Sequence, residues 1–383
     1  MRSSLRLASI AVPFAVLSAQ LQVAGAQVPS PKPDSAAPSR QGGRTFARLA
    51  AGPNFTCGLT SGGVAYCWGD DYHGQLGGGT TTQPVSGGLT FTQLAAAYGQ
   101  TCGVTSGGVA YCWGLQPGDG ATYRRASSPA AVSGGHTYTQ LAIGTAFTCG
   151  LTSGGAAYCW GWNFLGQLGD GTTTNRASPV TVSGGLAFTQ LVAGPTYTCG
   201  LVRSGTAYCW GTPPPGGGFG GTPRTSPVAV SGGLTFTQLA AGGSHTCGLA
   251  SGGRAYCWGA NDSGQVGDGT RTERVSPVAV SGGLTFTQLA AGGSYTCGLV
   301  SGGRAYCWGS NSGGQLGDGT TTSRVSPAAV SGELTFSQLE AGQTHTCGLA
   351  SGGLAYCWGQ NTIGQLGDGT RANRTSPVAV VNP

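Results

Sequence analysis

Short apolar stretches alternate with glycine-rich and polar turns over most of the chain, and the whole pattern recurs every 45 to 50 residues. A repeat of this length is typical of propellers, solenoids and arrays. Outside the N-terminal segment, no stretch spaces its apolar residues as a helix does. The seven copies begin at Phe46, Phe91, Tyr138, Phe188, Phe236, Phe286 and Phe336.

Each copy contains short segments rich in Thr, Val, Tyr, Phe or Trp and bounded by Gly or Pro, as strands are. In the sixth copy these segments predict the strands Thr285–Ala290, Ser294–Val300 and Arg304–Gly309, with Ser276–Val280 joining from the tail of the preceding repeat. Four strands in each of seven repeats predict an all-β fold, a seven-bladed β-propeller of four-stranded antiparallel blades.

The ends of the chain must complete such a ring. The last predicted strand, Ser376–Val381, has no following repeat to join. We expect it to pair with Thr45–Ala50 of the first repeat, because open end blades would expose strand edges.

Fourteen cysteines occur as seven pairs with one internal spacing. Folding the segment around Gly302 places Cys297 opposite Cys307, where Cβ atoms lie about 4.5–5.5 Å apart and a disulfide needs little adjustment. Gly298 then faces Tyr306 and is expected to leave room for its ring. The pattern predicts one disulfide-linked hairpin per blade: Cys57–Cys67, Cys102–Cys112, Cys149–Cys159, Cys199–Cys209, Cys247–Cys257, Cys297–Cys307 and Cys347–Cys357.

Metal binding and redox activity are the alternatives for these cysteines. Zinc sites gather four ligands at one point, and redox pairs usually have C-x-x-C spacing. Each pair here stands alone on its own blade, and His73, His136, His245 and His345 do not follow the pairs. We therefore expect structural disulfides, with no metal and no cofactor.

The N-terminal segment has the pattern of a secretory signal peptide over residues 1–26. Arg2 and Arg6 precede the apolar stretch Leu7–Leu17, and Ala24-Gly25-Ala26 provides a small-residue cleavage site. The apolar stretch is too short to span a bilayer. Residues 27–44, rich in Pro, Ser and Gly, are expected to form a disordered linker to the propeller at 45–383. The expected location is secreted, periplasmic or on the cell surface.

The distribution of charge along the chain bears on whether a nucleic acid is a partner. The chain has a net charge of +6, but from Thr45 onward 13 arginines face 11 acidic residues. Nucleic-acid binders usually carry a basic stripe, and none is evident here. We expect no nucleic-acid partner.

The repeat resembles the regulator of chromosome condensation repeat. The resemblance rests on the G-x-x-H-[ST] start in Gly342–Thr346 and on the W-G-x-N-x-x-G-Q-L-G core in Trp358–Gly367. It covers nearly all of residues 45–383 and implies a seven-bladed propeller; the paired cysteines suit an exported, bacterial-type member. The second and fourth repeats depart from the core after Trp113 and Trp210, so their loops are expected to differ.

The resemblance leaves function open. Its founding member is a nuclear guanine-nucleotide exchange factor that binds chromatin, a plant member is a photoreceptor, and a secreted bacterial member inhibits β-lactamases. We expect an exported scaffold that binds a protein or an envelope component, and we expect a monomer. The alternatives are an exchange-factor-like regulator of a GTPase, which the signal peptide disfavours, and a polysaccharide-acting enzyme.

The sequence gives no catalytic motif. Neither G-x-S-x-G nor H-E-x-x-H occurs. His245 and His345 occupy a repeat position that elsewhere holds Phe, Gln or Tyr, which indicates packing. We therefore expect that the protein is not an enzyme.

An Asp-Gly-Thr loop is followed by an arginine in each complete repeat. The pairs are Asp170 with Arg176, Asp268 with Arg274, Asp318 with Arg324, and Asp368 with Arg374. The first repeat lacks both members, having Gly78 and Gln83, so we predict an ion pair that braces the loop. A calcium site would need a different spacing. A ring of arginines that binds an acidic partner is the remaining alternative.

Positions where the repeats disagree are the better candidates for binding, because all copies share the scaffold. Large aromatic residues on rigid loops are typical of interface hot spots. The alternative is that these rings fill gaps between uneven blades. The candidates are Tyr72, His73, Tyr123, Arg124, Arg125, Trp162, Phe164 and Phe219.

Overall fold

The computed structural model describes residues 44–78, 83–115, 125–212 and 223–381. The chain divides into two units, Met1–Gln41 and Gly42–Pro383, and all described residues belong to the second. The predicted signal peptide, and the predicted linker apart from Arg44, lie outside the described residues.

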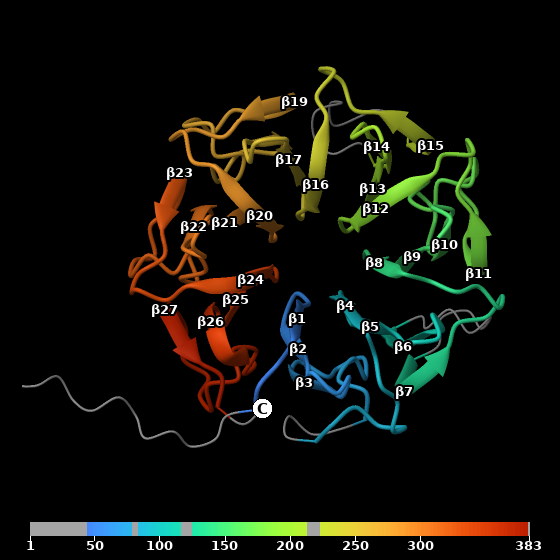
Figure 1. Cartoon of the computed structure of the whole chain (residues 1–383), viewed down its shortest axis with the longest axis horizontal. Coiled ribbons are helices and arrows are strands. Elements are labelled where there is room, and N and C mark those ends of the chain that lie inside the picture. Colours follow the sequence, from blue (N-terminus) through green and yellow to red (C-terminus); the bar gives the residue numbers. More distant parts are fainter. Residues whose placement is uncertain (1–43, 79–82, 116–124, 213–222, 382–383) are drawn as a thin grey trace, which may run out of the picture. The chain divides into compact units, whose positions relative to one another are not determined.

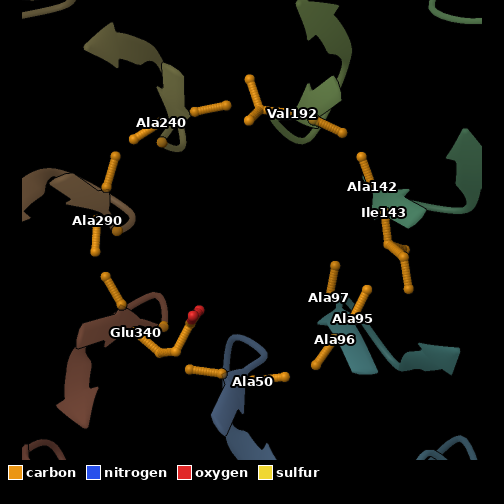
Figure 2. A pocket seen from close by; sticks show the side chains of 18 of the residues that line it. Ala50, Ala95, Ala96, Ala97, Ala142, Ile143, Val192, Ala240, Ala290 and Glu340 are labelled. Carbon is orange, nitrogen blue, oxygen red and sulfur yellow. The ribbon is translucent and has the colours of Figure 1, made fainter. Parts of the chain in front are cut away.

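Seven antiparallel sheets form a ring, and the chain runs outward through each sheet from the axis (Figure 1). The innermost strands line a central channel (Figure 2). They are β1 (Arg48–Ala51), β4 (Gln93–Ala97), β8 (Gln140–Ile143), β12 (Phe188–Ala193), β16 (Phe236–Ala241), β20 (Phe286–Ala291) and β24 (Phe336–Ala341).

The second and third strands of each blade form its hairpin. The second strands are β2 (Phe55–Leu59), β5 (Gln100–Val104), β9 (Phe147–Leu151), β13 (Tyr197–Val202), β17 (His245–Ala250), β21 (Tyr295–Val300) and β25 (His345–Ala350). The third strands are β3 (Ala65–Gly69), β6 (Ala110–Leu115), β10 (Ala157–Gly161), β14 (Ala207–Gly211), β18 (Ala255–Gly259), β22 (Ala305–Gly309) and β26 (Ala355–Gly359).

The fourth strands lie on the outside of the ring. They are β7 (Arg125–Ala131), β11 (Arg176–Thr181), β15 (Arg224–Ala229), β19 (Arg274–Ala279), β23 (Arg324–Ala329) and β27 (Arg374–Ala379). In the first blade the described residues form three strands, with a single bridge between Tyr66 and Pro84 at the outer position. A three-residue 3-10 helix, Ser351–Gly353, is the only helix among the described residues.

The predicted seven-bladed, four-stranded antiparallel propeller is confirmed, but the predicted origin of the fourth strand is wrong. Each blade is built from one repeat, so β19 belongs to the sheet of β16 rather than to the next blade. The loop after the third strand reverses the chain, and Gly259 pairs with Arg274.

The predicted closure of the ring is wrong for the same reason. The last strand, β27, pairs with β26 and not with Thr45–Ala50. The ring closes instead by packing of the seventh blade against the first. The amide of Phe46 donates to the carbonyl of Gly353 at 2.8 Å. Phe46, Leu49 and Trp68 share a buried cluster with Leu349.

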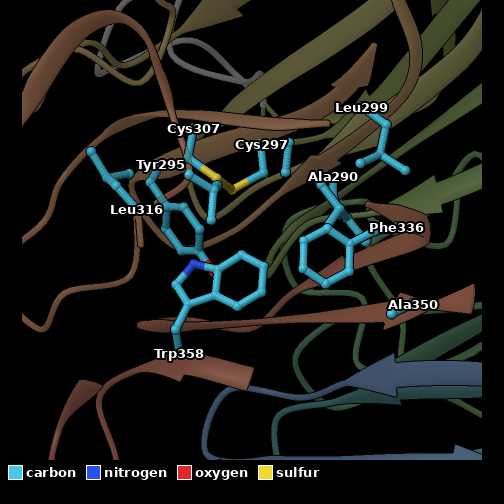
Figure 3. Packing of buried hydrophobic residues seen from close by; sticks show 12 residues of the cluster. Ala290, Tyr295, Cys297, Leu299, Cys307, Leu316, Phe336, Ala350 and Trp358 are labelled. Atoms are coloured by element: carbon cyan, nitrogen blue, oxygen red, sulfur yellow. A yellow bond between two sulfur atoms is a disulfide. The ribbon is translucent and has the colours of Figure 1, made fainter. Parts of the chain in front are cut away.

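The hairpin register predicted from the cysteine spacing is confirmed. Leu299 faces Ala305, Gly298 faces Tyr306, and Cys297 faces Cys307. All seven predicted disulfides are present, with Cα atoms 4.0–4.1 Å apart, and their side chains are buried. Between the sixth and seventh blades, Cys297–Cys307 lies among Tyr295, Phe336 and Trp358 (Figure 3).

The reason proposed for the glycine opposite tyrosine is wrong. A Cβ atom on Gly298 would lie 2.5 Å from Cδ1 of Phe286. The glycine therefore makes room for the phenylalanine at the start of the inner strand, on the other side of β21. Tyr306 stays half-buried at the edge of the cluster between the fifth and sixth blades.

In the five repeats that carry it, the motif Gly-Gln-Leu-Gly, or Gly-Gln-Val-Gly in the fifth, joins the blade to the next. The carbonyl of Gln265 accepts hydrogen bonds from Nε1 of Trp308 at 3.0 Å and Oγ1 of Thr296 at 2.9 Å. Gly267 is needed because a Cβ atom there would lie 2.5 Å from Nε1 of Trp308. The same bonds join Gln75 to Trp113 and Thr101, and Gln167 to Trp210 and Thr198.

Repeats two and four lack this motif, and the threonines of the following blades have other partners. Thr148 donates to Oε1 of Gln100 at 3.2 Å, and Thr246 donates to the hydroxyl of Tyr197 at 3.1 Å. The two irregular loops themselves, at 116–124 and 213–222, lie outside the described residues.

A second set of interblade bonds comes from glutamines of the inner strands. Nε2 of Gln288 donates to the carbonyl of Leu339 at 3.1 Å, and the amide of Leu339 donates to Oε1 of Gln288 at 2.9 Å. Gln140, Gln190, Gln238 and Gln338 make the same two bonds to the next blade, and Oε1 of Gln93 accepts from the amide of Leu141. In the first blade Arg48 replaces the glutamine and is exposed.

His245 and His345 are packing residues, as predicted. Both side chains are fully buried, and their Nε2 atoms lie 2.8 and 2.9 Å from Oγ1 of Thr296 and Thr56 in the next blade. Burial lowers the pKa of each ring to about 4, although the backbone of Pro53 acts in the opposite direction on His345. Both rings are therefore neutral at neutral pH.

Removal of one disulfide should destabilise its blade. Replacing both Cys297 and Cys307 by alanine should lower the free energy of unfolding by about 2–3 kcal/mol, because the unfolded chain regains the entropy of an open loop. Urea unfolding under non-oxidising and non-reducing conditions measures the loss. The equivalent pair Cys247 and Cys257 is the matched control and should show a similar loss. An unchanged midpoint in both variants would contradict a stabilising role.

The two buried histidines should make stability fall in acid. An unfolded histidine titrates near pH 6.5 and these rings near 4, so the unfolded state gains protons first as the pH falls through this window. The expected loss by pH 4.5 is about 2–3 kcal/mol per histidine. The double variant His245→Phe/His345→Phe, which copies Phe55 and Phe147, should lose most of this dependence. Equal pH dependence in both proteins would show that other groups cause it.

Candidate functional site

One end of the propeller carries both the inner turns and the long loops. Because the strands are antiparallel, the turn after the first strand and the loop after the third strand lie at the same end of each blade. Backbone bonds join them: the amide of Asp70 donates to Asn54 at 3.0 Å, and that of Trp162 to Ala146 at 2.9 Å. We call this end the loop face.

The loops are braced by the predicted ion pairs. Asp318 and Arg324 approach to 2.8 Å, and Nε of Arg324 donates a second hydrogen bond to the same carboxylate oxygen, also at 2.8 Å. The other oxygen accepts from Nδ2 of Asn311 at 3.1 Å and from the amide of Thr320 at 3.0 Å. The same pairs form between Asp170 and Arg176, Asp268 and Arg274, and Asp368 and Arg374.

This network satisfies the aspartates and leaves little for a ligand. Burial alone would raise the pKa of Asp318, but hydrogen bonds from Thr320 and Arg324 outweigh it and lower the pKa. The same balance holds for Asp170, Asp268 and Asp368. Among the described residues, no group of three or more His, Cys, Asp or Glu side chains could hold a metal ion.

Three of the predicted binding residues come together where the first and second blades meet. The side chain of Tyr72 is 72% exposed, and the guanidinium carbon of Arg125 lies 4.9 Å from the centre of its ring. Nη1 of Arg125 donates to the carbonyl of Tyr72 at 3.3 Å. The ring of His73 meets that of Tyr72 edge-on at 4.9 Å and covers Gly99 of the second blade. We call these three residues the Tyr72 cluster.

A second pair lies on the third blade. Phe164 is 59% exposed, and its ring lies 6.2 Å from that of the half-buried Trp162 in a T-shaped contact. Counted from the preceding Trp-Gly, Phe164 occupies the same loop position as Tyr72. Two blades therefore present an aromatic ring to solvent from equivalent places on the loop face.

The alternative that all these rings fill gaps between blades does not fit their exposure. Tyr72 and Phe164 face solvent, whereas His73 does pack against the neighbouring blade. Tyr123, Arg124 and Phe219 lie outside the described residues.

The central channel contains a residue that the sequence reasoning missed. The channel has a volume of about 360 Å³ and is lined by all seven inner strands. Among the described residues of its lining, Glu340 is the only acidic one, and its carboxylate points into the channel (Figure 2). Alignment of the inner strands would have found it, because the other six repeats have Ala or Val at this position.

Two further findings bear on the environment of the protein. Seven disulfides indicate folding in an oxidising compartment. In the described part of the chain, the single short helix cannot cross a bilayer.

Solved structures of other propellers resemble this one. Human WBSCR16 has 20% sequence identity and a TM-score of 0.73, with 80% of this chain and 87% of that chain covered. Prp20p from Saccharomyces cerevisiae, described with binding properties to Gsp1p and histones, has 20% identity and a TM-score of 0.69 over 77% and 80% of the two chains. The CR4 receptor kinase ectodomain from Physcomitrella patens has 26% identity and a TM-score of 0.55, covering 81% and 72%.

No curated protein sequence matches the chain. Sequence patterns of the Regulator of chromosome condensation (RCC1) repeat do match, in two forms. One covers residues 46–75, 138–167, 236–265, 286–315 and 336–365, and the other covers 154–201, 252–299, 302–349 and 352–383. Together they span more than half of the chain; the matches of the first form each lie within one blade, and the first three of the second form each run from one blade into the next. The chain therefore belongs to the regulator of chromosome condensation repeat family.

Proposed function

We propose that this protein is an exported binding scaffold that uses the loop face to bind a protein or cell-envelope component. The observation that carries the proposal is the pair of exposed aromatic residues, Tyr72 and Phe164, at equivalent places on loops of a rigid ring. Large amphipathic rings lose little side-chain entropy on binding and are enriched in interface hot spots.

The loops that carry these rings are held in place before any partner arrives. The amide of Leu76 donates to Asp71 at 2.8 Å, and that of Leu168 donates to Asn163 at 2.9 Å. In the first blade, Asp71 thus accepts the same backbone hydrogen bond that Asn163 accepts in the third blade. Preorganised loops avoid part of the ordering cost of association, which favours recognition by this face.

Export is proposed on two grounds. Residues 1–26 carry the charge, apolar stretch and cleavage pattern of a signal peptide. Seven disulfides suit an exported protein, since cytosolic thiols are kept reduced. A secreted, periplasmic or surface location, and a bacterial-type family member, agree with both. We further propose that it acts as a monomer.

The two alternative functions have less support. An exchange-factor role would come from the likeness to Prp20p, which at 20% identity extends to the fold alone. A polysaccharide-acting enzyme would normally use two facing carboxylates, whereas the lining of the channel holds a single one, Glu340. We therefore propose binding rather than catalysis.

The proposal is tested by capture from envelope and medium fractions with the oxidised, secreted protein. Two double variants each disrupt one of the two exposed aromatic sites: Trp162→Ala/Phe164→Ala and Tyr72→Ala/Arg125→Ala. At least one should weaken capture of a partner by about 30-fold, the effect of losing one hot-spot residue worth about 2 kcal/mol.

The matched control is Leu354→Ala, because Leu354 is 42% exposed in the turn between β25 and β26, at the opposite end of the blade from the loop face. This variant should capture the partner as the wild type does. Equal capture by the wild type and both loop-face variants would contradict the proposed surface. Absence of any captured partner would contradict the binding function.

A further inference from the structure

The central channel is a second candidate ligand site, apart from Tyr72 and Phe164, and it opens at the loop face, since inner turns such as Gly52–Pro53 belong to its lining. Its wall combines small apolar side chains from the inner strands, such as Ala50, Ala142, Val192 and Ala290, with polar groups (Figure 2). Its volume of about 360 Å³ exceeds what a few ordered waters need. The channel is therefore large enough for a slender aliphatic molecule.

Glu340 breaks the chemical uniformity of this wall. Its carboxylate accepts a hydrogen bond from Nε2 of Gln338 at 2.8 Å. No ion pair joins it to a basic residue of the described chain, and the described lining residues include no Lys, Arg or His. Arg48, on the adjacent strand β1, is not part of the lining. The channel thus holds a carboxylate without a counter-ion.

A carboxylate enclosed by the channel wall is costly to ionise. Burial raises the pKa of Glu340 to about 7, although the hydrogen bond from Gln338 acts in the opposite direction. A scaffold role does not require this residue, since the equivalent strands pack with Ala or Val. A bound cation would offset the cost of desolvating the charge.

The surroundings restrict the kind of cation. A calcium ion takes six to eight oxygen ligands, and a single carboxylate provides few of them. A quaternary ammonium needs an aromatic cage, and Tyr98 is the only aromatic residue in the lining. A guanidinium pairs best with two free carboxylate oxygens, but Gln338 already occupies one.

We propose that the channel binds a primary ammonium group on an unbranched aliphatic stem, with the ammonium paired to Glu340 and the stem against the Ala and Val methyl groups. The ammonium donates to the carboxylate oxygen that Gln338 leaves free. The stem replaces water beside these methyl groups. Such a group occurs in free alkylamines and in lysine side chains of proteins.

The test uses n-butylammonium, titrated into the oxidised protein by calorimetry and followed at Glu340 by carbon NMR. The wild type should bind it in a saturable manner and shift the carboxyl resonance. Glu340→Gln and Glu340→Ala should each weaken binding at least tenfold. Alanine occupies this position in five other blades, so the second variant keeps the fold.

The repeat symmetry offers a rescue experiment. The double variant Glu340→Ala/Ala290→Glu moves the carboxylate to the equivalent position of the sixth blade, where Gln288 corresponds to Gln338. It should recover binding of n-butylammonium. Butyrate and n-butanol, which have the same stem without a positive charge, should not bind. No saturable binding to the wild type, or equal binding by Glu340→Ala, would overturn the proposal.

Acidity provides an independent readout. The affinity for n-butylammonium should rise about tenfold from pH 6 to pH 8, as Glu340 ionises around pH 7. Tyr98 is the only other titratable residue in the lining, and burial raises its pKa, so it stays neutral in this range. An affinity that does not change with pH would contradict pairing to Glu340.

A peptide with one lysine, compared with its Nε-acetylated form, distinguishes the two sources of the ammonium. Binding of the unmodified peptide alone, lost in Glu340→Ala, would assign the site to a protein side chain. Binding of n-butylammonium without the peptide would assign it to free amines. The variants at Tyr72 and Phe164 should leave amine binding unchanged. The proposal for the channel and the proposal for the partner surface can therefore be contradicted independently.

Discussion

The propeller depends on the hydrogen bonds that one blade's third-strand loop offers to the tryptophan and threonine of the next. The carbonyl of Gln265 is the shared acceptor for Trp308 and Thr296, and both donors are buried. An unpaired donor there would cost about 1–3 kcal/mol. Where the motif is present, it therefore fixes the position of one blade relative to the next, and the inner strands and channel follow from that position.

Stabilisation within a blade is separate from stabilisation between blades. The disulfide joins the second and third strands of one blade, whereas the glutamine, tryptophan and threonine bonds cross to the next. At the junction of the first and seventh blades, where no peptide bond links the two, an inner-strand glutamine bond and a threonine bond to the third-strand loop are both present. Gln338 bonds to Leu49, and Oγ1 of Thr56 donates to the carbonyl of Gln365 at 3.0 Å. In contrast, Arg48 interrupts the glutamine series between the covalently linked first and second blades.

The sequence predicted what depends on local pattern. The period gave the blade count, the cysteine spacing gave the hairpin register, and the joint loss of two residues from the first repeat revealed the pairing seen in Asp318–Arg324. The fourth strand was assigned to the wrong blade because nothing in the repeated sequence marks where one blade ends and the next begins. The reason predicted for Gly298 was wrong because the ring that the glycine accommodates, that of Phe286, belongs to another strand. The exposure of Tyr72 and the direction of Glu340 arise from assembly of the ring and have no local signature.

Coincidence of one repeat with one blade bears on how such a chain can change in length. Every sheet, and every disulfide, begins and ends within a single contiguous segment. Duplication or loss of a whole repeat in the gene would neither divide a sheet nor leave a cysteine without its partner. Such an event changes only the number of blades in the ring. Each cysteine still forms its disulfide with the nearest cysteine of the same blade.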